Sequence, residues 1–302
     1  MDRTSQFGLC DFGCKMKSKN KAILYIICSA FCFAVMNASI RLAGDLPFMQ
    51  KVFFRNFVAA IAAFFILKKN HIKLTCKKEN RIYMFLRAFC GTLGMICNFY
   101  AIDHLMLADA SMLNKMSPFF AVVFSAIILK DKPTVFQLCA VLTAFAGSLF
   151  IIKPTFANAS LFPSLIGFLG GLGAGAAYAF VSKLGRGGEK GPVIVFVFSA
   201  FSCVTVLPYV ILHFVPMSLY QTLMLLLTGF SAAGGQFSIT AAYTHAPARE
   251  VSVFDYTQIL FSTLLGFFLF GQVPDKWSFV GYGIIILAAV SMFLYNNRKA
   301  VK

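Results

Sequence analysis

The stretch Pro192–Phe214, PVIVFVFSAFSCVTVLPYVILHF, decides the fold class of this chain. It runs for 23 residues without an Asp, Glu, Lys or Arg. An α-helix rises about 1.5 Å per residue, so a helix of this length exceeds the ~30 Å hydrocarbon core of a bilayer. Lipid offers no partner for backbone N–H and C=O groups, which a helix satisfies internally. The stretch therefore predicts a helix that crosses a membrane.

The remainder of the 302-residue chain repeats this pattern. It is 59% hydrophobic and 13% charged, with a mean hydropathy of +0.78, whereas a soluble chain is about 45–50% apolar and about 25% charged. This excludes a soluble enzyme, a disordered protein, a coiled coil and a disulfide scaffold. We predict an all-α, polytopic membrane protein with ten transmembrane helices, roughly at 22–42, 48–67, 82–101, 107–129, 134–152, 161–182, 192–214, 219–241, 249–270 and 277–295.

The basic residues predict the orientation of these spans. Of the 27 Lys and Arg residues, 20 fall on the same side as the N-terminus, four on the other side and three inside spans. Cytoplasmic loops carry the excess of Lys and Arg in membrane proteins. We therefore expect both termini in the cytoplasm and the chain in the plasma (cell inner) membrane. The net charge of +16 is then a topology signal, and no nucleic-acid partner is predicted.

The two halves of the chain match weakly when one is shifted by 141 positions. The residues that then coincide are Ala101 and Ala242, His104 and His245, Asp109 and Glu250, Ser111 and Ser252, Phe120 and Phe261, and Pro133 and Pro274. Because each half has five spans, an odd number, the second half would enter the membrane in the opposite direction. Inverted repeats of this kind are an architecture of secondary transporters.

The predicted boundaries follow from these repeats. We expect a cytoplasmic tail at 1–20, a first repeat at 21–153, a second repeat at 161–296 and a short cytoplasmic tail at 297–302. The N-terminal residues lack the apolar core of a signal peptide. Met16 offers an alternative start, in which case the preceding residues would be dispensable.

Two short sequence motifs, here called boxes, occupy equivalent positions in the two halves and resemble those of the EamA family of the drug/metabolite transporter superfamily. The first is LMLADASML at 105–113, followed by Ser117-Pro118-Phe119, and the second extends from Ala246-Pro247-Ala248 to Gly271-Gln272. The form of the first box is most similar to the branch with S-adenosylmethionine carriers and the mammalian solute-carrier 35G group. The resemblance implies a ten-helix basket whose central cavity carries small metabolites by alternating access.

Lys115 and Asp255 are the charged residues expected at the centre of this basket. Each lies about six to eight residues inside its span, and the two spans are repeat equivalents. A charge at such depth costs about 2.5–3.5 kcal/mol, so it normally faces a partner or a cavity. Three interpretations stay open: a structural ion pair, direct binding of a charged substrate or a coupling proton, and extension of the Lys115 side chain to the lipid headgroups.

Two arginines also fall inside spans. Arg87 lies near the cytoplasmic end of the third span and is expected to extend its side chain to the lipid headgroups. Arg55 lies in the second span, and from there it can reach the outer headgroups or pair inward. Neither arginine is counted among the predicted binding residues.

Uncharged polar side chains complete the predicted binding site. The resemblance implies that spans one, three, four, six, eight and nine surround the cavity, and amides or phenols at this depth bond either a solute or a neighbouring helix. The predicted substrate-binding residues are Asn37, Asn98, Asn114, Lys115, Tyr178, Gln236, Tyr243, Asp255, Tyr256 and Gln258.

Other motifs predict no chemistry. Gly167, Gly171 and Gly175 recur at every fourth position, which favours close packing within the chain, with a homodimer contact as the alternative. The nine cysteines lack zinc-site spacing. The segment 185–190 lacks the order of a phosphate-binding loop, and the pair His104 and Asp109 recurs on the opposite face. No catalytic residue, metal or cofactor is predicted.

The sequence as a whole indicates a secondary transporter in the lipid bilayer, not an enzyme. Its partner would be a small-molecule substrate, such as an amino acid or a nucleoside-type derivative, with a coupling proton as a further candidate. Two alternatives stay open: an intramembrane lipid-modifying enzyme, and a non-transporting receptor or channel subunit.

Overall fold

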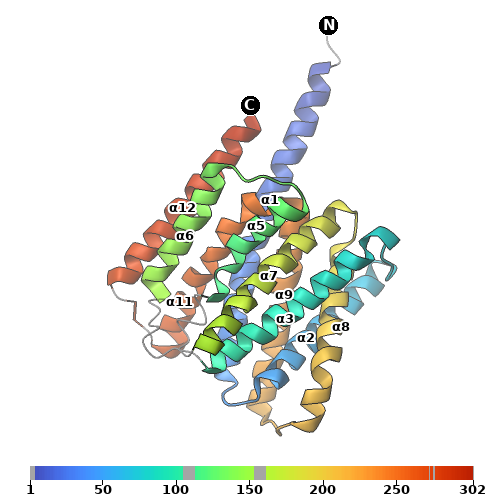
Figure 1. Cartoon of the computed structure of the whole chain (residues 1–302), viewed down its shortest axis with the longest axis vertical. Coiled ribbons are helices and arrows are strands. Elements are labelled where there is room, and N and C mark those ends of the chain that lie inside the picture. Colours follow the sequence, from blue (N-terminus) through green and yellow to red (C-terminus); the bar gives the residue numbers. More distant parts are fainter. Residues whose placement is uncertain (1–3, 105–112, 153–160, 272, 275, 302) are drawn as a thin grey trace.

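The computed structural model describes residues 4–104, 113–152, 161–271, 273–274 and 276–301. Within these ranges the chain is helical and contains no β-strand (Figure 1). Two 3₁₀ helices, η1 (Lys78–Asn80) and η3 (Ser252–Tyr256), precede α3 and α11. The α-helices are α1 (Thr4–Leu42), α2 (Phe48–Lys69), α3 (Arg81–His104), α5 (Ser117–Ile128), α6 (Val135–Ile152), α7 (Leu161–Arg186), α8 (Gly191–Leu212), α9 (Leu219–His245), α10 (Ala248–Val251), α11 (Thr257–Phe270) and α12 (Lys276–Val301).

Eight of the ten predicted spans coincide with helical stretches that are long and apolar enough to cross a membrane. The other two, the fourth and fifth, coincide with the shorter apolar helices Ser117–Ile128 and Val135–Phe150. In the fourth, α5 begins at Ser117 because Pro118 occupies its first turn, where a missing N–H is tolerated. The predicted start of that span, 107–112, and the boundary between the halves, 153–160, lie outside the described residues.

Helices of the first half pack against helices of the second half, and the pairing is symmetrical (Figure 1). α1 lies along α9 and α3 lies along α7, so the first helix of each half meets the third helix of the other half. α2 packs on α8 and α6 packs on α12, so the second and fifth helices meet their own counterparts. Two similar units related by a pseudo-two-fold axis pack in this way.

The first helices of the two halves, α1 and α7, run in opposite directions. Tyr25, near the start of the apolar part of α1, has its ring 5.8 Å from the ring of His245 at the end of α9. Ser182, near the end of α7, donates a 2.8 Å hydrogen bond to the carbonyl of Tyr243, also at the end of α9. Since the start of α1 and the end of α7 meet the same end of α9, the two helices are antiparallel.

Glycines bring α3 and α7 into backbone contact. A Cβ on Gly94 would lie 2.8 Å from the amide nitrogen of Ala174, and a Cβ on Gly170 would lie 3.0 Å from the amide nitrogen of Asn98. Gly175 packs on α5 in a similar way. The glycines of α7 therefore serve packing within the chain, which is the first of the two interpretations drawn from their spacing.

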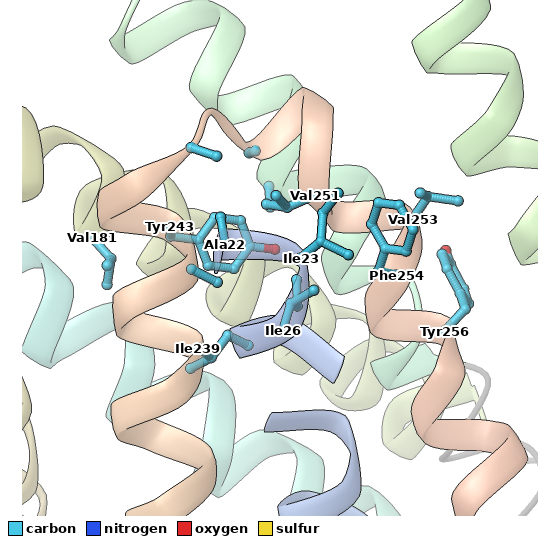
Figure 2. Packing of buried hydrophobic residues seen from close by; sticks show 14 of the residues in the cluster. Ala22, Ile23, Ile26, Val181, Ile239, Tyr243, Val251, Val253, Phe254 and Tyr256 are labelled. Atoms are coloured by element: carbon cyan, nitrogen blue, oxygen red, sulfur yellow. The ribbon is translucent and has the colours of Figure 1, made fainter. Parts of the chain in front are cut away.

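A hydrophobic cluster fills the end of the bundle where the apolar part of α1 begins (Figure 2). It joins Ala22–Ile26 of α1 to the end of α9 and to the α10–η3 segment. Burying an aliphatic or aromatic side chain of this kind contributes about 1.5–3 kcal/mol. The members drawn from these segments are 8% exposed or less, among them Ile23, Ile26, Ile239, Tyr243, Val251, Val253, Phe254 and Tyr256.

Candidate substrate-binding cavity

A cavity of about 680 Å³ lies between the two halves of the bundle. Its wall takes side chains from α1, α2, α3, α5, α7, α8, α9, η3 and α11. Gly44 and Asp45, in the connection from α1 to α2, are exposed residues of this wall, so the cavity reaches the surface there. At the inner end Asp255 lines the cavity while its neighbours Phe254 and Tyr256 belong to the hydrophobic cluster. The volume is in the range of small-molecule sites, about 300–1,000 Å³.

The structure brings most of the predicted binding residues to this one cavity. They come from α1, α3, the segment before α5, α7, α9, η3 and α11, and Asn37 and Gln258 lie 221 positions apart in the sequence, so the fold alone puts them together. Eight of the ten line the wall: Asn37, Asn98, Asn114, Lys115, Tyr178, Gln236, Asp255 and Gln258.

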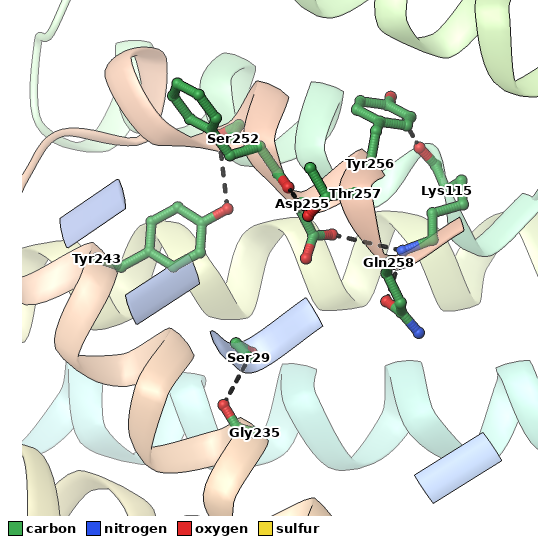
Figure 3. Close-up of polar contacts among 10 residues, drawn as sticks. Ser29, Lys115, Gly235, Tyr243, Ser252, Asp255, Tyr256, Thr257 and Gln258 are labelled. Carbon is green, nitrogen blue, oxygen red and sulfur yellow. Dashed lines mark hydrogen bonds and ion pairs between the residues drawn. The ribbon is translucent and has the colours of Figure 1, made fainter. Parts of the chain in front are cut away.

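Lys115 and Asp255 form an ion pair at the inner end of the cavity (Figure 3). Nζ of Lys115 lies 3.7 Å from Oδ2 of Asp255 and donates a 2.6 Å hydrogen bond to Oε1 of Gln258. The two charged side chains keep only 11% and 6% of their surface exposed. The pairing is the first of the three interpretations drawn from the sequence. Because both side chains also face the cavity, the geometry leaves them available to a solute.

Both members of this pair lie where a membrane helix is interrupted. Lys115 lies in a turn just before α5, and Asp255 lies in η3 between α10 and α11. An interrupted helix leaves backbone carbonyls without helical partners. The hydroxyl of Tyr256 donates a 3.0 Å hydrogen bond to one of these groups, the carbonyl of Lys115. Non-helical backbone at such depth is tolerated where it is buried in protein or faces a cavity.

Tyr243 and Tyr256 lie behind the cavity wall, which corrects their predicted place in the lining. Tyr243 is 2% exposed, its ring stacks on Tyr178 at 5.0 Å between centroids, and its hydroxyl lies 3.5 Å from Oγ of Ser252. Tyr256 is fully buried, and its hydroxyl bonds the carbonyl of Lys115. Because protein groups occupy both hydroxyls, these rings support the wall, and Tyr178 faces the cavity in front of them.

Arg87 also lines the cavity, and the prediction that it reaches the headgroups is wrong. Its side chain is 2% exposed and its guanidinium lies 4.2 Å from the centre of the Phe198 ring on α8. A Cβ on Gly91 would clash with this guanidinium, so the missing side chain one turn further along α3 makes room for it. The side chain therefore extends into the bundle and binds an aromatic face there.

Arg55, which the sequence left between two orientations, points inward. It is 8% exposed and lines the same cavity. Its guanidinium donates to the sulfur atoms of Met36 and Met95 and, over 3.2 Å, to the amide oxygen of Asn56. Both arginines are thus cavity residues that the sequence analysis did not include, although their position inside apolar spans was a signal for them.

Comparisons with known proteins agree with this architecture. A profile of the EamA-like transporter family matches residues 20–153 and 163–294. The pseudopaline exporter CntI of Pseudomonas aeruginosa is 30% identical over 273 residues, which cover 89% of this chain and 95% of that protein. The riboflavin transporter of Vibrio cholerae is 26% identical over 290 residues, covering 92% and 94%. Human solute carrier family 35 member G1 is 24% identical over 281 residues, covering 88% and 77%.

A solved crystal structure has the same fold as this chain. The two superpose with a TM-score of 0.79 over 93% of this chain and 99% of the other, at 14% sequence identity. The family profile matches both halves, so the resemblance drawn from the two sequence boxes is confirmed. The chain therefore belongs to the EamA-like transporter family and is a multi-pass membrane transporter of small molecules rather than an enzyme.

Proposed function

We propose that this chain is a secondary carrier that moves a small metabolite across the plasma membrane by alternating access. The observation that carries the proposal is a cavity that reaches the surface at the α1–α2 connection and is closed at the other end by the hydrophobic cluster. When two similar halves rock about a central site, the open and closed ends exchange. In this proposal α5 and α6 are the fourth and fifth spans, and the repeats 21–153 and 161–296 are inverted.

The charge distribution supports a definite sidedness for the carrier. The closed end carries the start of the apolar part of α1 and the ends of α7 and α9. Most of the Lys and Arg residues outside the spans fall on this side of the proposed topology, so it would face the cytoplasm, with both termini. The cavity is then open to the outside, where an exporter releases and an importer captures its substrate.

Counterflow in proteoliposomes tests the carrier function. Vesicles with the full-length protein are preloaded with one unlabelled compound, namely riboflavin, an amino acid, S-adenosylmethionine or a dicarboxylate such as succinate. The compound that is a substrate is expected to drive transient and saturable accumulation of its labelled form. Riboflavin is included because one relative is named as its transporter. Flux that neither saturates nor shows counterflow would indicate a channel subunit. Conversion of lipid without flux would indicate an enzyme, and either result would overturn the proposal.

Charged groups join the two halves across the closed end. Arg186, at the end of α7, contacts the carboxylate of Asp131, which follows α5. Arg249, in α10, has Nη1 3.7 Å from the same carboxylate and donates a 3.2 Å hydrogen bond to the carbonyl of Lys132. Asp131 belongs to the first half and both arginines belong to the second. In the proposed cycle these contacts break when the closed end opens.

Asp131→Asn is therefore expected to favour opening of the closed end. An ion pair near the surface contributes about 0.2–1 kcal/mol, so the loss of two pairs should change the population roughly twofold to thirtyfold. The measurement is the rate at which a membrane-impermeant thiol reagent, added from the cytoplasmic side, labels a cysteine placed at Ser252 in a background without native cysteines. Lys190→Gln, which removes an exposed charge at the same end, is the control. Equal rates in all variants would contradict a role for these contacts in closure.

Proton coupling and a homodimer remain predictions. Asp255 and Lys115 are the titratable pair at the inner end of the cavity, so a coupling proton would act there. An imposed pH gradient that drives no accumulation of a transported substrate would contradict coupling. The glycines of α7 pack on α3 and α5 within the chain, so they no longer support a dimer.

A further inference from the structure

Two buried arginines of the cavity have no acidic partner among the described residues. Nε of Arg87 makes no hydrogen bond, and its guanidinium lies over the Phe198 ring, 4.2 Å from the ring centre. Arg55 donates mainly to thioether sulfurs, which are weak acceptors. A buried guanidinium is normally paired with a carboxylate, because removing it from water without a partner is unfavourable. Both cations therefore retain donors that protein groups leave unused.

The acidic residues of the cavity wall do not balance these charges. Asp255 is paired with Lys115 at the inner end, and Asp45 is exposed at the mouth. The described wall contains five basic and two acidic residues: Arg41, Lys51, Arg55, Arg87 and Lys115 against Asp45 and Asp255. The cavity is therefore positively charged, and its buried excess comes from the two unpaired arginines.

The guanidinium of Arg87, from α3, and that of Arg55, from α2, both lie against the same face of α3. Arg87 extends over Gly91, and Arg55 contacts the sulfur of Met95 at 2.8 Å through Nη1. Positions 87, 91 and 95 follow one another at intervals of four, so they share one face of the helix. Successive turns are about 5.4 Å apart. One small ligand can therefore reach both guanidiniums at once.

We propose that the cargo is an organic anion with at least two carboxylate groups, and that Arg55 and Arg87 form its binding subsite. This deepens the proposed carrier function and rests on it. The planar fork of a guanidinium matches a carboxylate with two parallel hydrogen bonds. Such a ligand supplies the negative charge that the residues of the wall do not provide. The side-chain amides of Asn98 and Gln236 in the same wall add uncharged hydrogen-bonding groups.

Carboxylate fits this subsite better than phosphate does. Protein sites for phosphate commonly add free backbone N–H groups at a helix N-terminus or in a loop. Arg55 and Arg87 instead belong to α2 and α3 at positions more than one turn inside each helix, where the backbone N–H groups bond within the helix. The subsite therefore offers side-chain donors, which suit a carboxylate.

Thermal unfolding of the purified full-length protein tests this subsite. The probes are citrate and succinate, with neutral succinamide, inorganic phosphate and cationic putrescine for comparison. Citrate and succinate are expected to raise the melting temperature, because a ligand that binds the folded state stabilises it, whereas succinamide and putrescine are not. In Arg55→Gln and Arg87→Gln the half-saturating concentration is expected to rise about tenfold or more, the usual effect of losing a charged hydrogen bond.

Two further variants separate ligand binding from a structural role. Gly91→Ala keeps both arginines but displaces the guanidinium of Arg87, and should weaken citrate binding as well. Lys68→Gln removes an exposed charge from the same helix as Arg55 and should leave binding unchanged. Without ligand, Arg55→Gln should melt at the same temperature as the wild type or higher, because an unpaired buried charge is removed. A lower melting temperature together with unchanged citrate binding would show a structural role and overturn the proposal.

The remaining outcomes also decide the question. Citrate stabilises many proteins by exclusion from their surfaces. The binding signal is therefore the difference between the citrate-induced rise in melting temperature of the wild type and that of Arg55→Gln. No shift with either carboxylate, or a shift that both arginine variants keep, overturns the proposal. A larger arginine-dependent shift with phosphate identifies a phosphate site instead. Arginine-dependent binding of citrate or succinate without counterflow of the same carboxylate would reject the carrier alone. Saturable counterflow of neutral solutes that is unchanged in both arginine variants would reject the anion subsite alone.

Discussion

Asp255→Asn is expected to lower transport at least about tenfold and to lower the free energy of unfolding by about 3–5 kcal/mol. The substitution leaves the buried ammonium of Lys115 with uncharged amide groups only, that of Gln258, whose oxygen lies 2.6 Å away, and the one introduced at position 255. Breaking a buried ion pair on one side costs this much because the remaining charge is uncompensated. Transport falls in addition because the pair faces the cavity, and losing one charged hydrogen bond to a solute corresponds to about tenfold or more in affinity.

The double variant Lys115→Met with Asp255→Asn separates the two parts of this effect. Removing both charges takes away the unpaired ion, so the melting temperature should return close to that of the wild type. Transport should stay low if the pair binds the substrate or a proton. Counterflow and thermal unfolding measured on the two single variants and the double variant give the complete cycle. Wild-type transport by the double variant would reduce the pair to a structural role.

Gly94→Leu is expected to destabilise the fold by about 1–3 kcal/mol or more, the usual cost of overpacking. At this position even a Cβ would lie 2.8 Å from the backbone nitrogen of Ala174, so α3 and α7 would have to separate. That movement displaces Arg87 and Tyr178, which lie on these two helices and line the cavity. A large loss of transport should therefore accompany the fall in melting temperature.

Gly283→Ala serves as the matched control on α12. A Cβ at this exposed position has no atom within 4 Å. Alanine favours a helix over glycine by about 0.5–1 kcal/mol, so the control should be neutral or slightly stabilising. Similar losses at both positions would show that replacing a helical glycine is harmful wherever it lies, and that the close contact of α3 with α7 does not determine the effect.

The sequence alone determined the class, the spans and the presence of a polar centre. The length of an apolar run and the distribution of Lys and Arg are local properties of the sequence, and membrane insertion depends on them directly. Eight spans therefore lie where the apolar runs predict them. In span four the structure describes α5 from Ser117, where Pro118 occupies the first turn of the helix. A polar side chain inside an apolar span finds no hydrogen-bond partner in lipid, so it faces the interior of the bundle. Eight of the ten candidates accordingly line the cavity.

Only the tertiary structure decided which way each of these side chains points. Helices that are apolar all round carry little pattern to fix their rotation, so packing against neighbours sets it. The partners of Tyr243 and Tyr256 lie in other segments, and they turn both rings away from the cavity. Arg87 enters the cavity because Gly91 leaves space and Phe198 of a distant helix offers its ring. The charge of the cavity arises from such long-range contacts, which a linear sequence does not display.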